Sequence, residues 1–148
     1  MHENKKNERD GKLNPKVFIS HASNDVWVAK QLAKLIHECG ADTFLDADNI
    51  DHGDDFDDEI IKHAANSTEM LVLFTPIASE RKYVWFEMGL FAAARKRIVI
   101  VLYGVTKEDI STDKLMPNII KRIDSVNLND VDSYFRELRN RVKKTEID

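Results

Sequence analysis

Apolar residues along the chain alternate between short runs rich in β-branched side chains and longer stretches in which they recur every three or four positions. The short runs predict five strands, over 16–20, 41–45, 70–74, 98–103 and, more weakly, within 119–127. The longer stretches predict helices over about 26–39, 54–66 and 82–95, and a last helix that starts near 130. Ser23 or Asn24 can cap the first helix and Asp130 the last, whereas 105–118 predicts a loop with a short helix.

Strands that alternate with helices pair in parallel through right-handed crossovers. Five such strands predict an α/β fold with a flavodoxin-like, doubly wound parallel sheet in the order 2-1-3-4-5. Ligands of these sheets bind beyond the carboxyl ends of the strands, where the strand order reverses. The topology therefore places Ser20, His21, the segment 75–87 and the loop 46–53 around one crevice.

The composition is that of one globular domain, with 43% hydrophobic and 32% charged residues over 148 positions. We expect a disordered polar arm at 1–14 and a folded domain at 15–145. The net charge of −4 argues against nucleic-acid binding. The sequence shows neither a signal-peptide pattern nor an apolar segment of membrane-spanning length, and its single cysteine, Cys39, fits a reducing compartment. We therefore expect a cytoplasmic protein without membrane contact, whose basic C-terminal residues, including Arg141, form a solvated face.

Several familiar ligand motifs are absent from the sequence. Neither a phosphate-binding P-loop nor a Gly-x-Gly-x-x-Gly dinucleotide motif occurs. The third strand ends in Phe74-Thr75-Pro76, so it lacks the aspartate of a phosphoacceptor domain. The acidic stretch 46–58 lacks the glycine that a calcium-binding EF-hand loop needs, and the five histidines lack zinc-ligand spacing. We expect neither a metal nor a bound cofactor.

Four segments of this chain resemble the successive motifs of the Toll/interleukin-1 receptor (TIR) domain family, most closely its microbial branch. They are VFISHAS at 17–23, TFLD at 43–46, GD at 53–54 and YVWFEMG at 83–89. The resemblance spans about 16–142 and implies the flavodoxin-like fold. Many TIR domains are NAD+ glycohydrolases or ADP-ribosyl cyclases with one catalytic glutamate on the third helix, and others are assembly modules. The family glutamate corresponds to Glu87, although Tyr83 stands where the enzymatic pattern often has Trp.

The resemblance implies that NAD+ is a substrate rather than a cofactor, with Glu87 as the catalytic residue. Nicotinamide is cationic while it is bound to ribose and neutral once it leaves, so cleavage needs a fixed carboxylate near the sugar more than an acid. Ser20 and His21 are candidates to hold phosphate or ribose oxygens. The other candidate substrate contacts are Phe44, Asp46, Tyr83 and Trp85, of which Phe44 fits the core better than a ligand contact.

The sequence leaves the biological role open. The first hypothesis is an NAD+ nucleosidase, in microbial immune signalling against phage or in virulence, whose product is linear or cyclic ADP-ribose. The second is a non-catalytic module that binds other TIR domains, and a third is a nucleoside-processing transferase of related fold. For an enzyme we expect control by an upstream or downstream defence protein, or by self-association through the loop Asp46–Gly53 and the adjacent surface.

Overall fold

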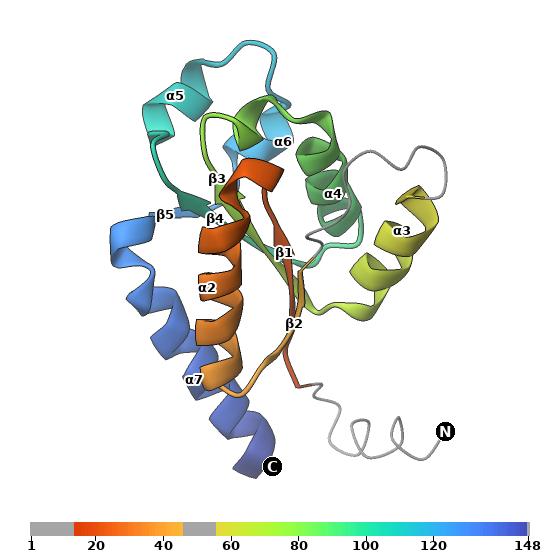
Figure 1. Cartoon of the computed structure of the whole chain (residues 1–148), viewed down its shortest axis with the longest axis vertical. Coiled ribbons are helices and arrows are strands. Elements are labelled where there is room, and N and C mark those ends of the chain that lie inside the picture. The colour runs from red at the N-terminus through yellow and green to blue at the C-terminus, as the bar shows by residue number, and fades with distance from the viewer. Residues whose placement is uncertain (1–13, 46–55, 148) are drawn as a thin grey trace.

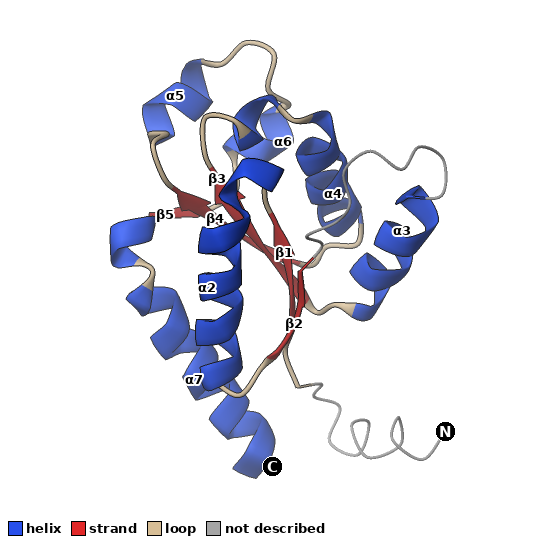
Figure 2. Cartoon of the chain, viewed as in Figure 1, coloured by secondary structure: helices blue, strands red, loops and turns tan. Residues whose placement is uncertain are grey.

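A five-stranded parallel sheet forms the centre of the protein (Figures 1 and 2). The computed structural model describes residues 14–45 and 56–147. The sheet has the order β2-β1-β3-β4-β5, which confirms the predicted flavodoxin-like arrangement. Every neighbouring pair of strands is parallel. The strands are β1 (Lys16–Ser20), β2 (Asp42–Leu45), β3 (Glu69–Phe74), β4 (Arg97–Leu102) and β5 (Ser125–Asn127).

Helices cover both faces of this sheet, so the central strands β1, β3 and β4 have a core on either side (Figure 1). One face packs against α2 (Val26–Glu38) and α7 (Asp132–Ile147), and the other against α3 (Phe56–Asn66) and α4 (Lys82–Ala93). The short helices α5 (Lys107–Thr112) and α6 (Asn118–Lys121) follow β4. Side chains of β1 alternate between the two cores, because successive residues of a strand point to opposite faces. Phe18 packs on the α4 side and Ile19 on the α2 side.

Two local predictions were wrong, each because of a tertiary contact. The predicted fifth strand within 119–127 is strand only at 125–127, since Pro117 precedes the one-turn helix α6, whose Ile120 is buried in the core. Ser23 and Asn24 do not cap α2 but lie in a 3-10 turn, Ser23–Asp25, that leads into it. Asp25 occupies the N-cap position, yet its carboxylate accepts a hydrogen bond from Thr75 instead of capping the helix.

A buried carboxylate anchors α7 to the amino-terminal end of β3. Glu69 is only 2% exposed. Its Oε2 accepts a hydrogen bond of 2.8 Å from the Tyr134 hydroxyl, and Arg141 binds both of its oxygens, at 2.6 and 3.0 Å. A buried charge is tolerated only when it is paired and hydrogen-bonded. The sequence had placed Arg141 on a solvated face. This prediction was wrong, because Arg141 pairs with the buried Glu69.

We expect Arg141→Met to destabilise the fold by roughly 3 kcal/mol, because it leaves the Glu69 carboxylate buried without its cation. Arg136 is an exposed arginine of the same helix, so Arg136→Met should change the free energy of unfolding by no more than about 0.5 kcal/mol. Urea unfolding of both variants measures the difference. Equal stability of the two variants would contradict the importance of this ion pair.

Candidate functional site

The side chain of Glu87 lies inside the protein, between α4 and the end of β1. It is 1% exposed, and its Oε1 accepts a hydrogen bond of 2.8 Å from the hydroxyl of Ser20. Ser20 is the last residue of β1 and lies two positions after Phe18, so it faces the same α4 side of the sheet. The helix and the strand thus bring together two residues that are 67 positions apart in the sequence.

Tyr83 makes a second connection between α4 and the chain that follows β1. It precedes Glu87 by four residues, so both side chains lie on the same face of the helix. Its hydroxyl donates a hydrogen bond of 3.1 Å to the backbone carbonyl of His21. Burial, followed by the negative charge of Glu87, raises the pKa of Tyr83 above its usual value. The phenol and the carboxylate are therefore electrostatic neighbours.

His21 directly follows Ser20 and is almost completely buried, with 2% of its surface exposed. Its Nδ1 lies 2.7 Å from the backbone carbonyl of Ala22. A carbonyl oxygen can only accept a hydrogen bond, so Nδ1 must carry a proton. Four of the predicted site residues, Ser20, His21, Tyr83 and Glu87, therefore form one cluster at the carboxyl end of β1.

Sequence analysis missed a second acidic residue beside this cluster, namely Asp25. The Thr75 hydroxyl, at the end of β3, donates a hydrogen bond of 2.6 Å to Asp25 Oδ2 and accepts one of 3.2 Å from the backbone N–H of Ala78. The charge of Asp25 is among the lesser causes that raise the pKa of Tyr83. Since β1 and β3 are neighbours in the predicted sheet, polar residues just beyond both strands were the signal that could have revealed this pair.

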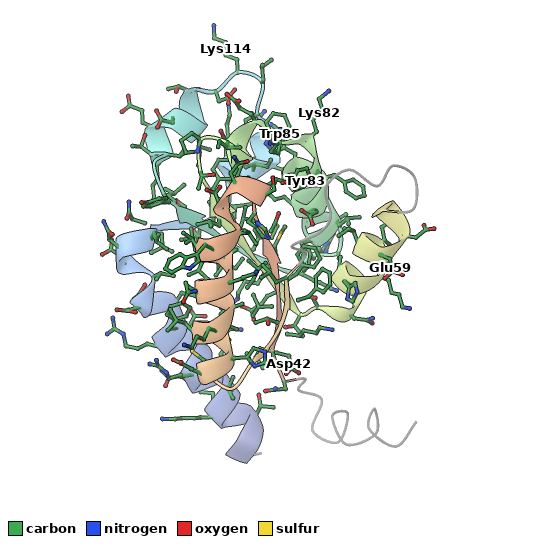
Figure 3. The ribbon with its side chains drawn as sticks, viewed as in Figure 1. Asp42, Glu59, Lys82, Tyr83, Trp85 and Lys114 are labelled. Atoms are coloured by element: carbon green, nitrogen blue, oxygen red, sulfur yellow. The ribbon has the colours of Figure 1, made fainter. Side chains whose placement is uncertain are left out.

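Phe44 and Trp85 belong to the core rather than to this cluster. The Phe44 ring stacks on His63 with 3.7 Å between the ring centroids and lies 5.1 Å from the Phe18 ring. Trp85 is two residues before Glu87, which places it on a different side of α4. Both side chains pack against the core on the α3 and α4 side of the sheet. Figure 3 shows Tyr83 and Trp85 on α4.

The remaining predicted contacts, Asp46 and the loop Asp46–Gly53, lie outside the described residues. Within 14–45 and 56–147, no group of His, Cys, Asp and Glu side chains is arranged to hold a metal ion. Over the same residues, none of the helices has the length and apolar character needed to cross a bilayer. The chemistry available in the described cluster therefore consists of a carboxylate, hydroxyls and an imidazole.

We expect Glu87→Gln to lower the pKa of Tyr83, because it removes the second-largest cause of the raised value. The pKa should stay above about 10, since burial is the largest cause and persists in the variant. NMR titration of ¹³Cζ-labelled tyrosine measures this pKa, with Tyr83→Phe to assign the signal. The matched control is Glu108→Gln at an exposed position of α5. If the two variants gave the same Tyr83 pKa, the described proximity of phenol and carboxylate would be wrong.

Comparisons with known proteins agree with this architecture. The TIR domain family model matches residues 17–141. No curated protein sequence matches the chain. Among solved structures, it is similar to the TIR domain of the Toll-related receptor TRR-2 from Hydra magnipapillata, with a TM-score of 0.60 and 20% sequence identity over 84% of this chain and 98% of that one. At this identity the likeness concerns the fold. The family model matches most of this chain, so the chain belongs to the TIR domain family, whose members act in signal transduction and generally self-associate or bind other TIR domains.

Proposed function

We propose that this TIR domain is an NAD+ nucleosidase that breaks the bond between nicotinamide and ribose, with Glu87 as its catalytic residue. The proposal is supported above all by the position of the Glu87 side chain. It is buried, it accepts a hydrogen bond from Ser20, and it lies at the carboxyl ends of the strands, where this fold binds ligands. A carboxylate in such a place has a stronger electrostatic effect on a ligand than one in water.

The reaction that we propose needs only a carboxylate from the protein. As the glycosidic bond breaks, its electron pair stays on the nicotinamide nitrogen, so the positive charge moves to the ribose. Glu87 stabilises this oxocarbenium-like sugar. Water then bonds to the anomeric carbon and releases a proton, which gives ADP-ribose. If a nucleophilic atom of the same ADP-ribosyl group attacks instead, the product is cyclic.

The neighbours of Glu87 hold its carboxylate and the adjacent backbone in fixed positions, as this mechanism requires. The Ser20 hydroxyl favours the ionised carboxylate and fixes the position of Oε1, whereas burial opposes ionisation. Tyr83 holds the backbone at His21, and the bond between Thr75 and Asp25 holds the turn that follows. A carboxylate that is already oriented loses little entropy when it meets the transition state.

A second candidate function is a non-catalytic module that assembles with other TIR domains. Family membership supports it, as does the similarity to the TIR domain of a Toll-related receptor. The hydrogen bond between Ser20 and Glu87 is also compatible with a structural role, because a buried carboxylate needs a donor in any protein. Measurements of activity separate the two functions.

We expect purified protein to consume NAD+, and Glu87→Gln to slow this by at least about a hundredfold, because the amide has no charge to stabilise the sugar. Glu108→Gln is the control for removal of an exposed carboxylate, and unfolding curves show whether each variant is folded. Mass spectrometry identifies the product as linear or cyclic. A folded wild type that consumes no NAD+ even at high, crowded concentration favours the assembly function. Activity that survives Glu87→Gln contradicts the assignment of the site.

We further propose that a neighbouring copy completes the pocket through the loop Asp46–Gly53 and the adjacent surface, in line with self-association across the family. The activity per molecule should then rise steeply with protein concentration, because most monomers lack a complete site. We expect an increase of more than about tenfold over the concentrations at which the protein associates. NAD+ consumption measured alongside sedimentation equilibrium tests this expectation. Full activity in a strictly monomeric sample would contradict it. An upstream or downstream defence protein remains a further proposed partner.

A further inference from the structure

Four side-chain donors around the end of β1 are directed at acceptors of the protein itself. The Ser20 hydroxyl donates to Glu87, the Tyr83 hydroxyl to the carbonyl of His21, and His21 Nδ1 to the carbonyl of Ala22. Beside them, the Thr75 hydroxyl donates to Asp25. In this arrangement the cluster presents acceptors to a ligand, and a ligand that binds it well must bring donors of its own.

His21 carries the clearest of these acceptors. The contact with Ala22 places a proton on Nδ1, so in the singly protonated ring Nε2 has a bare lone pair and can only accept a hydrogen bond. Nε2 is buried, and no partner for it exists among the described residues. A buried acceptor without a donor costs about 1–3 kcal/mol, so such an atom calls for an explanation. Its position beside Ser20, at the ligand-binding end of the sheet, provides one.

We infer that His21 Nε2 accepts a hydrogen bond from a ribose hydroxyl of the ligand, so that the side chains of Ser20 and His21 serve the sugar rather than a phosphate. This inference rests on the proposed function, because it names the part of NAD+ that meets this residue. The diphosphate group of NAD+ is fully ionised near neutral pH, so its oxygens can only accept hydrogen bonds and would face the lone pair of Nε2 unfavourably. A sugar hydroxyl donates to Nε2 through a single proton. The sequence alone had left both phosphate and ribose oxygens open.

Nitrogen NMR of the full chain with ¹⁵N-labelled histidine tests the inference directly. In the free protein at neutral pH, His21 should show a protonated Nδ1 and an unprotonated Nε2. Saturation with ADP-ribose, which keeps the ribose hydroxyls and has no nicotinamide to lose, should move the Nε2 signal upfield and leave Nδ1 protonated. Dimethyl phosphate, an ionised phosphodiester that carries no P–OH proton near neutral pH, and free nicotinamide should leave Nε2 unchanged. A proton on Nε2 in the free protein overturns the inference, as does a Nε2 signal that responds to dimethyl phosphate or nicotinamide but not to ADP-ribose.

Two substitutions separate the role of Nε2 from that of Nδ1. The amide of His21→Gln reaches the place of Nε2 and can accept a hydrogen bond, whereas the amide of His21→Asn reaches only the place of Nδ1. Calorimetry with ADP-ribose should show affinity within about threefold of wild type for His21→Gln and a loss of about tenfold for His21→Asn, as one hydrogen bond predicts. Equal losses in two folded variants overturn the inference.

Failure of this inference and failure of the proposed function give different results. Protein that consumes NAD+ while Nε2 ignores ADP-ribose retains the function and loses the inference. Protein that consumes no NAD+ while ADP-ribose still moves the Nε2 signal loses the function and retains the sugar contact. The tautomer of the free protein is measured before any ligand is added, so it does not depend on activity.

Discussion

The contact between Glu87 and Ser20 is the interaction on which the candidate site depends. A carboxylate that is 1% exposed must find a donor inside the protein, and the end of β1 supplies a hydroxyl at 2.8 Å. One face of α4 carries both Glu87 and Tyr83, so both side chains reach the end of β1 and the chain that follows it. The hydrogen bond from Tyr83 to the backbone of His21 then secures the chain where it leaves the strand. Helix and strand thus define the geometry of one end of the sheet.

Two buried glutamates show how the same residue type is used at opposite ends of this sheet. Glu69, at the amino-terminal end of β3, is matched by the full positive charge of Arg141 and by the hydroxyl of Tyr134. Glu87, at the carboxyl end, is held by the neutral hydroxyl of Ser20. An arginine next to a carboxylate offsets much of the field of that carboxylate, whereas a neutral hydroxyl orients it.

The TIR fold is compatible with both catalysis and assembly. A TIR domain uses its sheet and helices as a rigid frame, and fold alone does not determine whether the frame serves a reaction or an interface. In this chain the polar side chains of the candidate site are concentrated in α4 and the turn after β1. The aromatic side chains of Phe44 and Trp85 pack against the core on the same side of the sheet as α4.

The sequence by itself predicted the sheet order, the helix that carries Glu87, and the placement of Ser20, His21 and the segment 75–87 at one end of the sheet. The choice of Glu87 within that segment came from the resemblance to TIR domains. Periodicity and strand alternation are local properties, and in a doubly wound sheet they imply which strand ends meet. Only the tertiary structure decided the partners of individual atoms, because these contacts join residues far apart in the chain. Asp25 meets Thr75 across 50 positions and Glu69 meets Arg141 across 72, and no local pattern encodes either pair. The proton on His21 Nδ1 was likewise settled by one backbone carbonyl within reach of the folded ring.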